Sequence, residues 1–125
     1  MGYNYEPKSV RESAILTTSY VPGTVIEDIK NNNQLVLLVD FTKGSLTSLE
    51  LIIEVSDDNV NFYQETSEAF TAGEGVVSLA NRIIDTAGKY EILRPIKAAF
   101  VRVSVKGTGT VTGSLCAVKA LIGQV

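Results

Sequence analysis

The side chains of this chain that could perform acid–base chemistry are mainly carboxylates, because none of its 125 residues is histidine. Without imidazole, general acid–base catalysis depends on Asp, Glu, Lys or Tyr groups with shifted pKa values. The carboxylates available for a glycosidase-like pair are Glu50, Glu54, Asp57, Asp58, Glu65, Glu68 and Asp85. Their spacing does not single out two that would face each other across a cleft, and the sequence contains no phosphate-loop or nucleophile motif. We therefore expect a protein that is not an enzyme.

One short segment has the spacing of metal ligands. Asp57, Asn59 and Asn61 occupy alternate positions, like the first three ligands of a calcium loop, and Glu68 is twelfth counted from Asp57. Phe62, however, stands where such a loop needs glycine. The same residues suit a tight turn in which Asp and Asn side chains bond to their own backbone. We expect the turn, with no metal and no other cofactor.

Charge and composition restrict the partners. Eleven Lys and Arg residues against fourteen Asp and Glu residues give a net charge of −3, which argues against broad electrostatic binding of nucleic acid. The longest apolar run, Leu35 to Val39, is far shorter than the roughly 20 residues that cross a bilayer, so we expect no membrane partner. Hydrophobic residues make up 45% of the chain. That is high for a small domain, and it fits either a well-filled core or apolar surface covered by other subunits.

The elements that must position these groups have the signature of β-strands. Residues 1–13 are polar, contain Pro7 and show no period, so we expect an extended N-terminal arm followed by one domain over residues 14–125. The expected extended segments are 14–20, 24–29, 34–41, 49–56, 76–84, 90–93, 100–106 and 113–122, and residues 70–75 are expected to form a loop. Residues 77–86 are the one stretch with any helical character, and it is poor. About eight short strands separated by turns predict an antiparallel β-sandwich.

Two strand faces carry charges of opposite sign. Glu50 and Glu54 share one face of their strand, and Arg102 and Lys106 share one face of another. If the two strands are neighbours, these charges would pair across the ladder and help to fix its register. The lone Cys116 lies in an apolar strand-like segment, and we expect an inert buried thiol.

Three segments together resemble a known group of proteins. Residues 56–63 (SDDNVNFY) look like the Ser-x-Asp-Gly-x-x-Trp-Tyr turn of small β-sandwich modules, with Asn59 in place of Gly and Phe62 in place of Trp. Residues 88–92 (GKYEI) and 100–110 (FVRVSVKGTGT) follow in the expected order. From Leu49 to the C-terminus the chain resembles small jelly-roll-like virion structural proteins of tailed bacteriophages, of the head decoration or cement type. It is more distantly similar to discoidin-like and carbohydrate-binding sandwiches.

This resemblance implies a structural role in the virion. The chain would be a capsid decoration protein that stabilises the head by bridging subunits of the major capsid protein, and it would form a homo-oligomer such as a trimer. Tyr3, Tyr5 and Val10 of the arm are the residues expected to order against a partner. Two alternatives remain open. One is a neck or tail ring component, and the other is a carbohydrate-binding module in which Tyr63 and Tyr90 stack on sugar.

Overall fold

All regular secondary structure in the part of the chain that the structure describes is β-strand, and every strand pairing is antiparallel. The computed structural model describes residues 6–27, 34–95 and 98–123. A four-stranded sheet has the order β1 (Glu6–Ala14), β11 (Leu115–Gly123), β3 (Gln34–Thr42) and β9 (Gly88–Pro95). A second sheet has the order β2 (Val21–Pro22), β10 (Phe100–Gly109) and β4 (Leu46–Ser56), with β5 (Tyr63–Gln64) and β8 (Arg82–Ile84) both on the outer edge of β4. The expected all-β, antiparallel architecture is confirmed.

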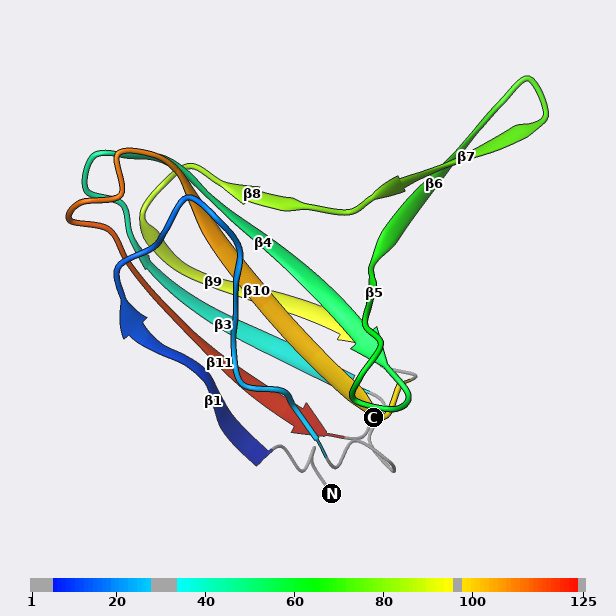
Figure 1. Cartoon of the computed structure of the whole chain (residues 1–125), viewed down its shortest axis with the longest axis horizontal. Helices are drawn as coiled ribbons and strands as arrows, with labels where there is room; N and C mark the ends of the chain where they lie inside the picture. Colours follow the sequence, from blue (N-terminus) through cyan, green and yellow to red (C-terminus); the bar gives the residue numbers. More distant parts are fainter. Residues whose placement is uncertain (1–5, 28–33, 96–97, 124–125) are drawn as a thin grey trace.

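Side chains from strands of both sheets form one hydrophobic core, and Figure 1 shows the strands that carry them. Alternate residues of a strand point to opposite faces of its sheet, so each strand contributes every second side chain. From β3 the core receives Leu35, Leu37, Val39 and Phe41, and β4, β10 and β11 contribute in the same alternating way. The outer residue Leu38 stays 37% exposed, so β3 is not covered on both faces.

The register of the β4–β10 pair follows the charges. Glu50 lies opposite Lys106 and Glu54 opposite Arg102, with N–O distances of 3.1 Å in both pairs. The Arg102 guanidinium also lies 4.0 Å from the centre of the Phe62 ring, where a cation–π contact forms. The cross-strand pairing predicted from the sequence is therefore confirmed.

The N-terminal segment differs from the expected arm. Of residues 1–13, those from Glu6 onward form the edge strand β1, which pairs with β11 from Glu6–Ile122 to Ala14–Cys116. Val10 is 3% exposed and belongs to the core, because it occupies an inward position of this strand. Its carbonyl accepts a 2.8 Å hydrogen bond from the Thr24 N–H. The assignment of this segment to a free arm is wrong from Glu6 onward.

A third pair of strands lies apart from both sheets. Strands β6 (Thr66–Thr71) and β7 (Glu74–Leu79) pair with each other and, among the described residues, with no other strand; they extend away from the rest of the molecule (Figure 1). This ribbon includes residues expected to be a loop (70–75), and the weak helical candidate (77–86) contains no helix but the end of β7 and all of β8. A search of the described residues finds no helix long and apolar enough to cross a membrane.

Candidate interaction site: a projecting β-hairpin

The hairpin of β6 and β7 follows from a short turn between two strands of alternating pattern. Ala72 and Gly73 both have positive φ angles, 53° and 83°. Two central residues of this kind make a type I′ turn, whose twist matches that of the flanking strands. Six residues pair on each side, from Thr66–Leu79 to Thr71–Glu74.

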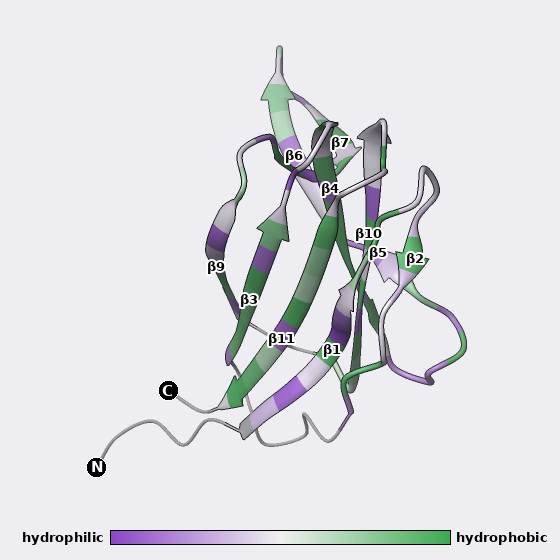
Figure 2. Cartoon of the chain, turned by 90° about the vertical axis from the view of Figure 1, so that its left-hand side faces the viewer, coloured by the Kyte–Doolittle hydropathy of each residue, from purple (hydrophilic) through white to green (hydrophobic). Residues whose placement is uncertain are grey.

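The two faces of the hairpin differ in character. One face, which we call the docking face, carries Glu68, Phe70, Val77 and Leu79. Phe70 lies across from Gly75, and its ring covers the space that a glycine leaves open: a Cβ built at Gly75 would lie 3.1 Å from the ring. The other face is built mostly from small or polar residues, namely Ser67, Ala69, Thr71, Glu74, Val76 and Ser78. The hydropathy colouring shows apolar positions on both hairpin strands (Figure 2).

The docking face is open to solvent. Phe70 is 72% exposed, Leu79 64% and Val77 61%, and no hairpin residue belongs to the hydrophobic core. A two-stranded hairpin standing alone in water is marginally stable, and its two unpaired edges are available for pairing with another chain. An apolar face on such a ribbon is typical of a surface that another molecule covers.

Hydrogen bonds to neighbouring segments hold the base of the hairpin. The Ala80 N–H donates to the Glu65 carbonyl at 2.9 Å, and the Glu65 N–H donates to the Ile53 carbonyl of β4 at 2.9 Å. The Gln64 side-chain amide donates to Asn81 Oδ1 at 2.7 Å. These bonds fix the two points at which the chain leaves the sheet edge and returns to it.

A cluster of three charged side chains strengthens this base. Arg82 of β8 donates twice to the Glu65 carboxylate, the longer bond being 3.2 Å, and Arg94 of β9 donates to the same carboxylate. Since β8 and β9 belong to different sheets, Glu65 links both sheets at the foot of the hairpin. Burial by itself raises the pKa of Glu65, but the hydrogen bonds and charges of Arg82 and Arg94 outweigh it and hold that pKa below its usual value. Glu65 therefore anchors the foot of the hairpin through its two arginine partners.

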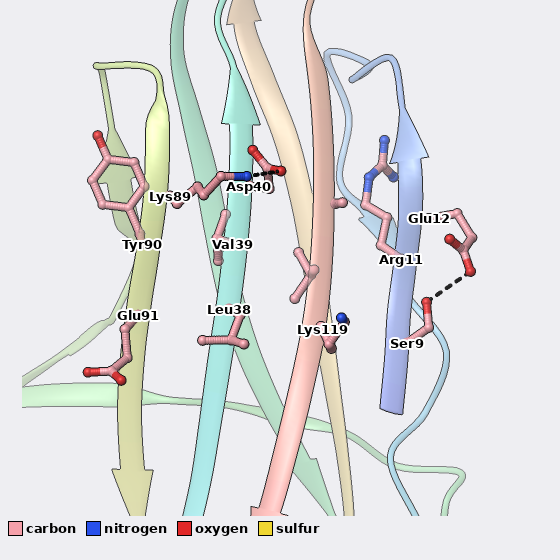
Figure 3. Close-up of a pocket in the computed structure, with 12 residues that line it drawn as sticks. Ser9, Arg11, Glu12, Leu38, Val39, Asp40, Lys89, Tyr90, Glu91 and Lys119 are labelled. Carbon is pink, nitrogen blue, oxygen red and sulfur yellow. Dashed lines mark hydrogen bonds and ion pairs between the residues drawn. The ribbon is translucent and has the colours of Figure 1, made fainter. Parts of the chain in front are cut away.

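A groove of about 470 Å³ crosses the outer face of the four-stranded sheet (Figure 3). In one row across the strands, Glu91, Leu38 and Lys119 lie side by side on β9, β3 and β11. Lys89 pairs with Asp40 at 2.8 Å in the next outward-facing row. We call this surface the sheet groove.

The other charged groups of the sheet groove are bound internally. Arg11 donates to the carbonyls of Cys116, Ala14 and Ile15, and Glu12 accepts from the Ser9 hydroxyl at 3.1 Å. Among the described residues, Glu91 and Lys119 make no ion pair or side-chain hydrogen bond. The sheet groove therefore presents one open cation and one open anion on either side of an exposed leucine.

The residues predicted to bind a partner are not brought together. Tyr3 and Tyr5 lie outside the described residues, and Val10 is in the core, where it cannot contact a partner. The two tyrosines of the sugar-binding alternative lie on different sheets: Tyr63 is exposed on β5, whereas Tyr90 on β9 packs against the core. The Tyr90 hydroxyl donates to the Thr86 carbonyl.

The segment with calcium-like spacing forms a turn held by its own side chains. Asp58 Oδ1 accepts from the N–H groups of Val60 and Asn61 at 2.9 and 2.8 Å, and Ser56 Oγ accepts from that of Asn59 at 3.0 Å. These bonds to Asp58, of which the backbone N–H of Asn61 has the greatest effect, lower the pKa of its carboxyl. Within the described residues no three His, Cys, Asp or Glu side chains come together as a metal site would require. The predicted Asx-rich turn is confirmed.

Sequence reasoning missed the hairpin as a separate element. The signal that could have identified it is the pair of alternating segments around Ala72-Gly73, since a glycine-containing dipeptide between two such segments is typical of a two-residue turn. The sequence pattern places Phe70 in an expected loop and Val77 and Leu79 in an expected extended segment. Comparison with known proteins adds no family: neither a scan against protein-family models nor a search of curated proteins gave a match.

Proposed function

We propose that this protein is a non-enzymatic structural component of a bacteriophage virion, most consistent with a capsid decoration protein that bridges coat subunits. The finer fold that we propose with it is a jelly-roll β-sandwich. If β5 and β8 are counted as two halves of one edge strand, interrupted by the hairpin, the strands of the two sheets are numbered one to eight along the chain. The sheet orders then become 1-8-3-6 and 2-7-4-5.

That order supports a jelly roll because it places each consecutive strand, except one pair, in the opposite sheet. Jelly rolls of eight strands are common in viral capsid proteins and in lectins. The strand order therefore agrees with the virion resemblance of residues 49–125, although a fold alone does not define a function.

The observation that carries the assembly role is the projecting hairpin. It presents Phe70, Val77 and Leu79 to solvent on a ribbon that contributes nothing to the core. A monomeric protein gains little stability from such a ribbon, whereas an assembly protein uses it to reach a neighbouring subunit. In this proposal the hairpin takes the partner-contacting role that the sequence suggested for the N-terminal arm.

The experiment that tests the virion role measures particle association. Particles from the native source, washed in moderate salt, are analysed for this chain by quantitative gel densitometry against the major coat protein. Hundreds of copies per particle support a decoration protein, and about a dozen support the neck or tail ring that is our second candidate. Absence from particles overturns the virion proposal.

A carbohydrate-binding module is the alternative outcome of that test. Lectins are among the proteins that use the jelly roll, and the sheet groove is an exposed surface that could hold a sugar. Glycan-array binding that is lost in a folded Tyr90→Ala variant would favour this alternative over assembly, because Tyr90 lines the sheet groove. Loss in Tyr63→Ala instead would place the sugar on the other sheet.

A further inference from the structure

We propose that the partner of the hairpin is a second copy of this chain, and that the docking face of one copy binds in the sheet groove of the next. This inference rests on the proposed role of the hairpin as an assembly arm and names its partner. The contact is intermolecular because the ribbon points away from both of its own sheets (Figure 1). Within the part of the chain that the structure describes, no strand pairing joins β6 or β7 to either sheet.

The two surfaces match in charge. The hairpin from Thr66 to Leu79 contains two acidic residues, Glu68 and Glu74, and no Lys or Arg. Glu68 lies on the docking face among apolar side chains and makes no ion pair within the described residues. The sheet groove offers the counterpart, the ammonium group of Lys119 beside Leu38 (Figure 3). An unpaired carboxylate in one apolar patch and an unpaired ammonium in the other favour each other across an interface.

The two surfaces also match in size and in apolar character. A ribbon of six residue pairs is about 20 Å long, and four strands spaced by about 4.8 Å give the sheet a similar width. Besides Leu38, the outer side of the sheet carries the exposed Leu93 and the half-buried Leu121 in one row across the strands; Val36, which lies between them, is already buried. Phe70, Val77 and Leu79 would cover this row.

The position of Glu91 defines the direction of the hairpin in the groove. Glu91 lies two strands away from Lys119, which corresponds to about 10 Å. Glu68 of the docking face therefore lies on the β11 side of the groove, near Lys119, where it avoids repulsion by Glu91. Of the other groove charges, Lys89 and Asp40 pair with each other. Arg11 and Glu12 keep their charges, and their side chains are held by backbone carbonyls and by the Ser9 hydroxyl.

Two adjacent valines, Val76 and Val77, provide a matched test of self-association. Self-association is measured by light scattering after size-exclusion chromatography and by sedimentation velocity. Val77 lies on the docking face and Val76 on the opposite face, and both are more than half exposed. Val77→Ser should weaken self-association about tenfold, the effect of losing one buried valine, whereas Val76→Ser should change it by less than about twofold. Because both residues lie outside the core, unchanged thermal unfolding of the variants verifies that each is folded.

Charge reversal identifies the groove as the receptor. Glu68→Lys and Lys119→Glu should each weaken self-association by roughly tenfold, and the double variant should regain it. A 1:1 mixture of the two single variants should also associate, since every contact between unlike copies then pairs opposite charges. Recovery in the mixture favours a dimer or another even-numbered ring, whereas recovery restricted to the double variant favours a trimer.

Three results would overturn the inference. The first is that the native protein stays monomeric at concentrations up to roughly 100 μM. The others are that Val76→Ser and Val77→Ser weaken self-association equally, or that the double charge-reversal variant does not regain self-association. The particle test separates this failure from that of the proposed function. If the chain is monomeric but Val77→Ser loses binding to particles while Val76→Ser retains it, the hairpin contacts a coat subunit and the virion role stands. If none of the variants binds particles differently and the native chain is absent from them, the proposed function fails as well.

Discussion

The anchor at the foot of the hairpin permits a quantitative prediction. Glu65→Gln keeps the size of the side chain and part of its hydrogen bonding but removes the negative charge between Arg82 and Arg94. The two arginines would then lie close together without an anion. We expect the variant to fold, to unfold at a lower temperature, and to hold the hairpin less rigidly.

The loss of stability expected for Glu65→Gln follows from how deeply Glu65, Arg82 and Arg94 are buried. The Glu65 side chain is 10% exposed, and those of Arg82 and Arg94 are 31% and 29% exposed. Fully exposed pairs contribute about 0–1 kcal/mol, and breaking a fully buried pair costs about 3–5 kcal/mol. A cluster between these limits, with Gln retaining some bonds, should lose about 2 kcal/mol. In a chain of this length that corresponds to a decrease in Tm of roughly 6–10 °C.

The stability that the Glu65 carboxylate contributes should depend on pH. The pKa of Glu65 is lower in the folded protein than its ordinary value of 4.5, so the stabilisation is complete above about pH 4.5. It is lost as the pH falls through the folded-state pKa, because the carboxyl must then be protonated in both states. Urea unfolding at a series of pH values should therefore show a difference between wild type and Glu65→Gln that is largest near neutral pH and shrinks below about pH 4.5.

A matched control separates this effect from a general loss of negative charge. Glu74→Gln makes the same substitution at an exposed hairpin position that has no ion pair within the described residues. Its free energy of unfolding should stay within about 0.5 kcal/mol of the wild type. Equal effects of the two substitutions, or a Glu65→Gln difference that does not change between pH 7 and the acid limit, would refute the anchoring argument.

The remaining predictions concern the hairpin, the thiol and the Asn59 turn. Replacing residues 66–79 with Asn-Gly should leave a folded protein with a Tm within about 3 °C of wild type. The reason is that the bond from the Ala80 N–H to the Glu65 carbonyl is the one that closes a two-residue turn. Unfolding of this variant at room temperature would contradict the prediction. Burial raises the pKa of the Cys116 thiol to about 11, so this thiol should react with a thiol reagent only in denaturant. Rapid labelling of the native protein would show instead that β1 and β11 separate readily. Asn59 has a φ angle of 60°, a conformation that glycine adopts without strain and valine does not. In chemical denaturation the free energy of unfolding of Asn59→Gly should equal or exceed that of wild type, whereas that of Asn59→Val should be lower by about 1–2 kcal/mol. Similar values for both variants would mean that the turn rearranges.

Several features were predictable from the sequence because they depend on short-range patterns. The alternation of apolar and polar residues in 49–56 and 100–106 identifies strands, and the charges of Glu50, Glu54, Arg102 and Lys106 predict their register correctly. The turn at Asn59 is likewise local, since Asn tolerates a positive φ angle better than most residues. The buried state of Cys116 follows from its apolar neighbours.

Other features, such as which strand faces are buried, depend on pairing between segments that are distant in the sequence. Nothing in residues 6–14 distinguishes a free arm from an edge strand, and it is pairing with β11 that places Val10 in the core. The segments of β6 and β7 carry apolar residues in the same alternating pattern as buried strands. They remain outside because the edge of β4 is already occupied by β5 and β8, which leaves the inserted hairpin without a sheet to join.

Local sequence thus determined that this protein is made of antiparallel strands, where several of them turn and how one pair aligns. The tertiary structure determined which apolar faces are covered and which stay open. The physical reason is range: the alternation of a strand is set by neighbouring residues, whereas burial of its face depends on segments distant in the chain. The open docking face of the hairpin, from which we infer self-assembly, belongs to the second kind.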